Sequence, residues 1–234
     1  MNKKLYLKKL DTVEGFDVWM IDGRSVRENF EKNFTNFGQF YKYSFIPRNE
    51  LWLDKENVPG EDKYYISNLL VERRLMSGGM DYIKAHEIAC LAEKEQRNES
   101  ELMKGVKKIR EKEVLEKIRK EKISLGIDNI FAWIVNGEMV RGQYFIDFTM
   151  GGHDKVYNFV PENELWVDDD VLPKERDYIL LHELHERNLM ARGLDYAKAH
   201  ESANDVEFLC RSQPSLFNKQ IEKETDIVAS AIEL

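Results

Sequence analysis

The sequence repeats itself once, and this internal repeat limits the folds that are open to the chain. A shift of 114 positions places Trp19 on Trp133 and the run 49–52 on the run 163–166, with no gap. The match covers roughly residues 15–95 and 129–209. A long internal repeat predicts that one structural unit is built twice. Other identical pairs are Gly23/Gly137, Pro47/Pro161, Tyr64/Tyr178, Glu72/Glu186, Gly79/Gly193, Asp81/Asp195 and His86/His200.

Each copy has the pattern of a short β region followed by two helices. In both copies the first β-prone stretch ends in an Asp-Gly or Asn-Gly dipeptide, which is typical of a hairpin turn. Pro59 and Pro173 stand where a first helical turn tolerates proline. The predicted fold class is α+β, with a small antiparallel sheet and a helical hairpin in each copy. The expected strands are 18–21, 25–30, 43–46 and 51–53, and 132–135, 139–146, 157–160 and 165–167.

The charged segment between the copies predicts a helix that joins them. Val106, Ile109, Leu115 and Ile118 fall near helical spacing. The lysine excess of this segment could contact an acidic partner, but we favour a solvated linker face. After Pro214, one more helix is expected within 216–234. The predicted domains are a degenerate first repeat (1–97), a charged helical linker (98–126), a second repeat (127–212) and a C-terminal tail (213–234).

Composition argues against several classes of protein. The 234 residues are 42% hydrophobic and 33% charged, with a formal net charge of −8. These values favour a globular protein and argue against broad nucleic-acid binding. No apolar run is long enough to cross a membrane, and the first residues lack the apolar core of a secretion signal. We therefore expect a cytoplasmic protein without membrane contact. Cys90 and Cys210 are too few for a disulfide framework or a thiolate zinc site.

The second copy carries histidines and carboxylates at helical spacing. His182 and Glu186 are four residues apart, so a helix would present both on one face. Gly193 is expected to end that helix, because glycine readily adopts the left-handed conformation. Asp195 is expected to cap a second helix. If that helix folds back, it brings His200 to the other two side chains.

Two imidazoles and a carboxylate that converge are typical of a metal site with an open coordination position. His182, Glu186 and His200 are the predicted ligands, and Glu183 is the predicted general base. Zn²⁺ suits this donor set, with Fe²⁺ or Mn²⁺ as alternatives. Further candidate ligands are His153, in a Gly-Gly-His loop, and His185. The alternative is a purely structural helical hairpin, held by a Glu186–His200 hydrogen bond and a Glu183–Arg187 ion pair.

The first copy lacks most of these groups. It keeps only Glu72 and His86, which match Glu186 and His200. We therefore expect the site in the second repeat only, although the retained pair is also compatible with a structural role in both copies. The replaced positions are Gln39 for His153, Asn68 for His182, Leu69 for Glu183 and Val71 for His185.

The second copy resembles a family of small, largely uncharacterised bacterial and phage-encoded proteins with a His-Glu-x-x-Glu helix and a downstream Ala-His. The matching segments here are Gly151-Gly152-His153, Pro161 to Trp166, His182 to Met190 and Ala199-His200. The resemblance covers most of 129–209, and 15–95 in degenerate form. It implies a zincin-like, metallopeptidase-like domain. It also allows an antagonist of a host or phage system, which no residue supports directly.

Two functions remain open on the sequence. The first is a metal-dependent hydrolase, with peptide cleavage as the reaction that the helix motif suggests. The second is a non-catalytic interaction protein with a structural metal or none. The partner would be a protein or peptide, and the chain would be a pseudo-symmetric monomer or a homodimer.

Overall fold

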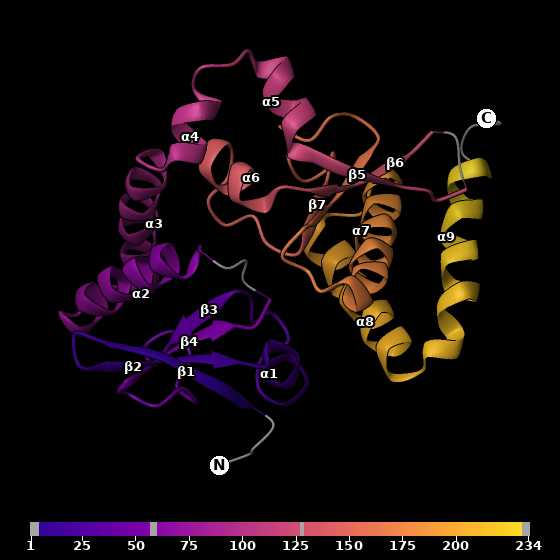
Figure 1. Ribbon diagram of the computed structural model, residues 1–234. Coiled ribbons are helices and arrows are strands. Elements are labelled where there is room, and N and C mark those ends of the chain that lie inside the picture. Colours follow the sequence, from indigo (N-terminus) through magenta and orange to yellow (C-terminus); the bar gives the residue numbers. More distant parts are fainter. Residues whose placement is uncertain (1–4, 57–59, 127–128, 231–234) are drawn as a thin grey trace. The chain divides into compact units, whose positions relative to one another are not determined.

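The computed structural model describes residues 5–56, 60–126 and 129–230, and their fold class is α+β (Figure 1). The chain forms two compact units, each with a four-stranded sheet followed by helices. Unit 1 comprises residues 1–110 and 141–147, and unit 2 comprises residues 111–140 and 148–234. The two halves are similar, as the internal repeat predicted.

The first eight elements are β1 (Tyr6–Val13), β2 (Phe16–Ile21), α1 (Gly23–Asn29), β3 (Phe37–Gln39), β4 (Glu50–Asp54), α2 (Asp62–Ser77), α3 (Tyr82–Asn98) and α4 (Glu101–Val106). The chain continues with α5 (Glu111–Ile118), β5 (Arg119–Ile123), β6 (Phe131–Val135), α6 (Gly137–Gln143), β7 (Gly151–His153) and β8 (Glu164–Asp168). A short 3-10 helix (Pro173–Glu175) precedes α7 (Arg176–Ala191) and α8 (Tyr196–Ser212), and another (Pro214–Leu216) precedes α9 (Phe217–Ser230).

Both sheets are mixed. Their strand orders are β1-β2-β4-β3 and β5-β6-β8-β7. The central pairs, β2 with β4 and β6 with β8, are parallel, and the outer pairs are antiparallel. The purely antiparallel sheet that the sequence predicted is therefore wrong. The parallel register is the same in both units, because Trp19 lies opposite Trp52 and Trp133 lies opposite Trp166.

A helix, not a hairpin turn, follows the first central strand of each sheet. The strands predicted at 25–30 and 139–146 are wrong, because α1 begins at Gly23 and α6 at Gly137. A parallel pair needs a crossover connection, and these helices form part of it. A Cβ added at Gly23 would overlap the Asp54 carboxylate, and one at Gly137 would overlap a buried aspartate of β8. These glycines recur because of that close approach, and not because of a hairpin.

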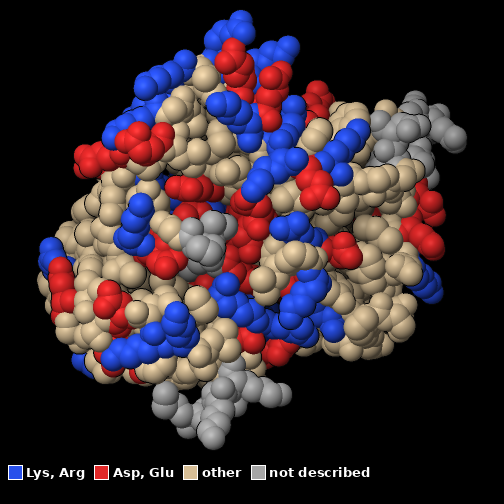
Figure 2. Space-filling view, viewed as in Figure 1, with Lys and Arg blue, Asp and Glu red and all other residues tan. Residues whose placement is uncertain are grey.

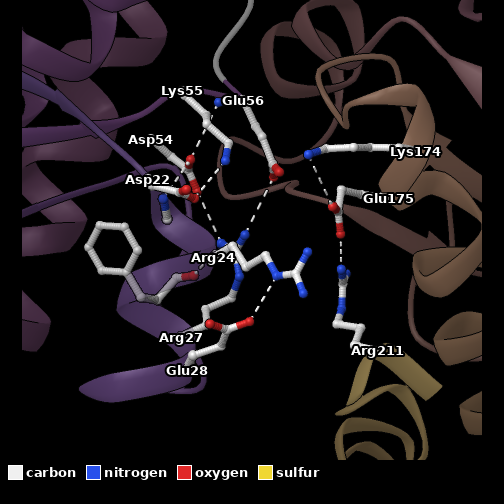
Figure 3. A network of polar contacts seen from close by, with 12 residues as sticks. Asp22, Arg24, Arg27, Glu28, Asp54, Lys55, Glu56, Lys174, Glu175 and Arg211 are labelled. Carbon is white, nitrogen blue, oxygen red and sulfur yellow. Dashed lines mark hydrogen bonds and ion pairs between the residues drawn. The ribbon is translucent and has the colours of Figure 1, made fainter. Parts of the chain in front are cut away.

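Asp54 fastens α1 to the end of β4 (Figure 3). Its Oδ1 accepts a hydrogen bond from the Gly23 N–H at 3.1 Å, and its Oδ2 accepts one from Arg27 Nη1 at 3.0 Å. Lys55 pairs with Asp22, the residue before α1, with 2.6 Å between the charged atoms. The end of β4 therefore determines where the crossover helix begins.

The third strand lies earlier in the chain than the sequence predicted. The segments 43–46 and 157–160 form turns, and the short strands β3 and β7 precede them. A Cβ at Gly152 of β7 would lie only 2.5 Å from the ring of Tyr157. The glycine therefore leaves the room that this ring needs. The strands predicted at 51–53 and 165–167 are confirmed as β4 and β8.

The segment between the repeats is not one helix. It holds the short helices α4 and α5 and then β5, an edge strand of the second sheet that pairs antiparallel with β6. The second repeat therefore begins before residue 127. The strand was missed because Arg119–Ile123 is mostly charged, and its pairing with β6 is not visible in the local pattern.

The helical hairpins are confirmed. In unit 1 α2 packs on α3, and in unit 2 α7 packs on α8. Pro173 begins a 3-10 helix, whereas Pro59 lies outside the described residues. The predicted C-terminal helix is α9, and residues 231–234 also lie outside the described part. None of the helices in the described ranges combines the length and apolar composition that crossing a membrane requires.

Figure 2 shows charged side chains of both signs scattered among uncharged residues. Lys and Arg residues are interspersed there with Asp and Glu residues rather than gathered into one basic patch. The absence of nucleic-acid binding stays a prediction.

Candidate metal centre

The hairpin of α7 and α8 forms as the sequence predicted. α7 ends at Ala191, and Gly193 adopts a φ of +92°, in the left-handed region. The Leu194 N–H then donates to the Leu189 carbonyl at 3.1 Å, which closes the end of the helix. The Asp195 carboxylate accepts from the Lys198 N–H at 3.1 Å and so caps α8. This turn sends α8 back along α7.

The hairpin brings together three of the predicted ligands. His182 Nε2 lies 3.3 Å from His200 Nδ1 and 3.5 Å from Glu186 Oε2, and His200 Nδ1 lies 2.7 Å from the same oxygen. Ligand atoms at 2.0–2.1 Å from a tetrahedral zinc ion lie about 3.3–3.4 Å apart. Two of the three separations are close to that value, and the third is shorter. The donor set and its spacing therefore fit a divalent ion.

The side chains around this trio are buried except on one side. Glu186 is 3% exposed, and His182 is 7% exposed. The His200 side chain is 34% exposed and stacks on the ring of Tyr196. A ligand or substrate would therefore approach the trio from the side of His200.

A second layer of polar contacts orients His182. Its Nδ1 bonds Glu207 Oε2 at 2.9 Å, and Glu207 Oε1 accepts from Arg211 Nε at 2.8 Å. Arg211 in turn pairs with Glu175, as Figure 3 shows. A histidine whose Nδ1–H donates to a carboxylate presents the lone pair of Nε2, which is the usual arrangement of a metal ligand. Nε2 is the atom that faces His200 and Glu186.

One feature of the sequence indicates these contacts, and the prediction overlooked it. Glu93 and Arg97 of the first copy precede Glu207 and Arg211 by the same 114 positions, with the spacing of an ion pair within a helix. Both copies form the pair, with 2.8 Å between Nε and Oε1 in each. The pair lies near the end of the aligned region, where few other positions match.

His153 lies against the trio but acts as a hydrogen-bond donor. Its Nδ1 accepts from the Lys155 N–H at 3.1 Å, so the proton of the neutral ring lies on Nε2. Nε2–H donates to Glu186 Oε1 at 2.9 Å. This bond leaves Oε2 for the ion, so in this arrangement His153 orients a ligand. His153, Glu183 and Glu186 also place ligand atoms within 4.8 Å of one another, so His153 stays a candidate ligand.

Glu183 lies next to this group without a hydrogen bond to any described residue. Its carboxylate lies so close to Gly151 that a Cβ added there would be 2.9 Å from Glu183 Oε1. Burial and the neighbouring carboxylates of Glu186 and Glu207 raise the pKa of Glu183 to about 8, although the charge of His182 opposes them. A cation among the three ligands would favour the ionised form and lower this pKa again. The predicted Glu183–Arg187 ion pair is absent from the described contacts, in which Arg187 binds Asp154 at 2.6 Å.

Burial and hydrogen bonds also shift the pKa values of His182 and Glu186. Burial alone would lower the pKa of His182, but hydrogen bonds with Glu186 and Glu207 raise it to about 10. Burial would raise the pKa of Glu186, but hydrogen bonds from His153, His182 and His200 hold it well below its ordinary value. The cluster thus favours a charged carboxylate between imidazoles.

His185 does not belong to the site. Its Nδ1 bonds Glu224 Oε1 of α9 at 2.8 Å, and its Nε2 bonds Ser202 Oγ at 2.9 Å. Asn188, one turn along α7, also donates to Glu224, at 3.0 Å. His185 and the ligand Glu186 are adjacent in the sequence and lie about 100° apart around the helix, so His185 faces α9 and α8 instead of the trio. The prediction of His185 as a reserve ligand is therefore not supported.

The first copy keeps the hydrogen-bond frame of this site with other side chains. Gln39 Nε2 donates to Glu72 Oε1 at 2.7 Å, as His153 does to Glu186. Asn68 Nδ2 donates to Glu93 Oε2 at 2.8 Å, in the place of His182 and its glutamate. Amides thus stand in unit 1 where imidazoles stand in unit 2, and the hydrogen bonds to the two glutamates are present in both. Glu72 and His86 remain, with 3.1 Å between Oε2 and Nδ1.

The fold and the site define a duplicated α+β protein whose second unit holds a cluster of histidines and carboxylates. In comparisons with known proteins, the chain matches no protein-family model, no curated protein and no solved structure. The zincin-like resemblance therefore stays a prediction, and function has to be inferred from the side chains themselves.

Proposed function

We propose that the protein is a metal-dependent, zincin-like hydrolase whose active site lies in the second repeat. The observation that carries this proposal is the spacing of His182 Nε2, Glu186 Oε2 and His200 Nδ1, which lie 2.7–3.5 Å apart. Two imidazoles and one carboxylate suit Zn²⁺, and they also suit Fe²⁺ or Mn²⁺.

Each side chain then has a distinct task. His182, Glu186 and His200 hold the ion, which supplies Lewis acidity to a carbonyl group and to a nearby water. Glu183 accepts the proton of that water on a carboxylate oxygen and passes it to the leaving group. His153 and Glu207 orient the ligands through the hydrogen bonds described above. The substrate class that we propose, a peptide or protein, follows from the helix motif.

Metal content tests the first part of this proposal. In protein purified without a metal-binding tag, His182→Ala should lose one equivalent of metal per chain relative to the wild type. His185→Gln is the matched control, because His185 lies on the same helix but binds Glu224. Equal metal content in the wild type and His182→Ala would rule out this site.

Peptide cleavage tests the second part. The metal-loaded protein is incubated with a library of unstructured peptides, and the products are identified by mass spectrometry. Cleavage should require the metal and be lost when a chelator removes it. Cleavage that persists in His182→Ala at full rate would contradict the assignment.

The second candidate is a non-catalytic interaction protein, and one observation favours it. In the first copy, Gln39 and His86 hold Glu72 by hydrogen bonds without the other predicted ligands. The same frame in the second copy could be structural. On this alternative the second unit contains a structural ion or none, and Glu183 has no role. A cytoplasmic location and a monomer or homodimer remain parts of the proposal in both cases.

A further inference from the structure

Unit 1 contains a different cluster of metal-binding side chains. His86 and Cys90 lie one turn apart on α3, and Asp147 comes from the segment 141–147, which belongs to unit 1. Each of the three side chains places one possible ligand atom close to the other two. His86 Nε2 lies 3.3 Å from Asp147 Oδ1, and Cys90 Sγ lies 3.5 Å from that nitrogen and 3.6 Å from that oxygen.

These separations match the edges of a zinc tetrahedron. With zinc bonds of 2.0–2.1 Å to nitrogen or oxygen, two such ligands lie about 3.3–3.4 Å apart. A thiolate at 2.3 Å lies about 3.5–3.7 Å from either of them. All three observed distances agree with these values, which is a closer fit than in unit 2.

The ring of His86 is oriented as a metal ligand would be. Its Nδ1 lies 3.1 Å from Glu72 Oε2, and the other oxygen of Glu72 accepts from Gln39 at 2.7 Å. With Nδ1–H donating to this fixed carboxylate, Nε2 presents its lone pair to Cys90 and Asp147. Tyr82 stacks on the ring with 5.3 Å between the centroids, which further limits its rotation.

We propose that unit 1 binds one divalent zinc-type ion through His86 Nε2, Cys90 Sγ and Asp147 Oδ1. The Cys90 thiol loses its proton to solvent as the sulfur–metal bond forms. Asp147 is 42% exposed, so water can occupy the fourth position. The ion joins α3 to the segment 141–147, and its role is structural. This site shares no residue with the site in unit 2 and does not depend on the proposed function.

A metal-free alternative has to be distinguished. Hydrogen bonds with Asp147, Cys90 and Glu72 raise the pKa of His86 to about 12, although burial opposes them. A protonated His86 could therefore balance the two carboxylates by itself, with a neutral Cys90 thiol. Lys42 adds a cation nearby, since Glu72 and Asp147 act on its pKa, which burial lowers.

Cobalt distinguishes the two states, because a thiolate ligand to Co²⁺ gives a charge-transfer absorption in the near ultraviolet. The full chain is freed of metal with a chelator and titrated with Co²⁺ alone. We expect the band in the wild type, its loss in Cys90→Ser and its persistence in Cys210→Ser, the matched control. The band should also persist in His182→Ala, where the unit 2 site no longer competes for Co²⁺, and saturate there at one equivalent. No band in the wild type, or loss in Cys210→Ser or His182→Ala, would overturn the proposal.

Two further measurements keep the test independent of folding in the Cys90 variant. Asp147→Asn should weaken Co²⁺ binding at this site at least tenfold, and unchanged affinity would remove Asp147 from the ligand set. In the wild type, Zn²⁺ should slow alkylation of Cys90 at least tenfold and leave Cys210 unaffected, as read by peptide mass spectrometry. Equal alkylation rates of Cys90 with and without Zn²⁺ would also contradict the proposal.

Discussion

At the scale of single residues, Glu183 and Glu207 differ in what they contact. Glu207 connects His182 to Arg211 through hydrogen bonds of 2.9 and 2.8 Å. Glu183 is buried at 7% exposure and accepts no hydrogen bond from the described residues. The first geometry suits a residue that orients a ligand, and the second suits a group that exchanges a proton.

Glu183→Gln is expected to keep the unit 2 metal and lose hydrolysis. An amide cannot accept the proton of a water, so the rate should fall by about 10²–10⁴-fold. Metal content by elemental analysis and cleavage of the library peptides measure the two effects separately. Full activity in Glu183→Gln would exclude this residue as the base.

Glu207→Gln is expected to weaken metal binding in unit 2. Loss of the carboxylate partner of a ligating histidine costs about 10–100-fold in affinity. Glu93→Gln is the matched control, since Glu93 holds the equivalent place in unit 1 beside Asn68. Competition with a chelating dye measures the metal affinity of the unit 2 site in each of the two variants. An equal loss in the two variants would indicate a general loss of stability instead.

At the scale of elements, the crossover helices α1 and α6 begin where a glycine meets a buried carboxylate. Asp54 and Asp168 are each 1% exposed, and a Cβ on Gly23 or Gly137 would overlap them. The position of these helices sets the path from one parallel strand to the next. A side chain at either glycine must therefore move the aspartate or the start of the helix.

Gly137→Ala is expected to lower the free energy of unfolding by about 1–3 kcal/mol, the usual cost of an overpacked site. Gly105→Ala is the control, because Gly105 lies within α4 and a Cβ there meets nothing within 4 Å. That substitution should be neutral or stabilise the chain by about 0.5–1 kcal/mol. Urea denaturation measures both, and equal stability of the two variants would contradict the close approach.

At the scale of the whole molecule, part of the second repeat packs in unit 1. Arg141 belongs to the second copy by sequence, but its guanidinium binds the Glu61 carboxylate through two hydrogen bonds, of 3.0 and 2.6 Å. Arg97 of α3 donates to the same carboxylate at 2.5 Å. Glu61 therefore holds the segment 141–147 in unit 1, and this segment also supplies Asp147.

Glu61 should make stability fall in acid. Burial would raise its pKa, but Arg141 and Arg97 hold the pKa below its ordinary value of 4.5. A depressed carboxyl pKa stabilises the folded state above that ordinary value, and the contribution is lost as the pH falls through the folded pKa. Denaturation between pH 7 and pH 3 should therefore show wild-type stability approaching that of Glu61→Gln.

At neutral pH, Glu61→Gln should lower the free energy of unfolding substantially. Glu61→Gln removes the carboxylate that Arg141 and Arg97 share, although Arg97 keeps its pair with Glu93, and should cost about 3–5 kcal/mol at pH 7. Glu28→Gln is the control, because the Glu28–Arg24 pair is exposed and should contribute about 0–1 kcal/mol. A stability gap between wild type and Glu61→Gln that does not change with pH would contradict this account.

The duplication, the helical hairpins and the convergence of His182, Glu186 and His200 could all be predicted from the amino-acid sequence. These features depend on contacts within a few turns of helix. The spacing of four residues puts two side chains on one face, and Gly193 and Asp195 fix where one helix ends and the next begins. Such local rules act on neighbouring residues, so a single sequence contains the information.

The remaining features could not be predicted from the sequence, because they depend on contacts between residues far apart in the chain. The parallel pairing of β2 with β4 replaced the predicted hairpin, and His185 turned to Glu224 on α9. The count of two cysteines argued against a thiolate zinc site, and it gave no sign that Cys90 would meet Asp147, 57 positions away. Which distant side chains converge is set by packing between elements, and no local periodicity records it.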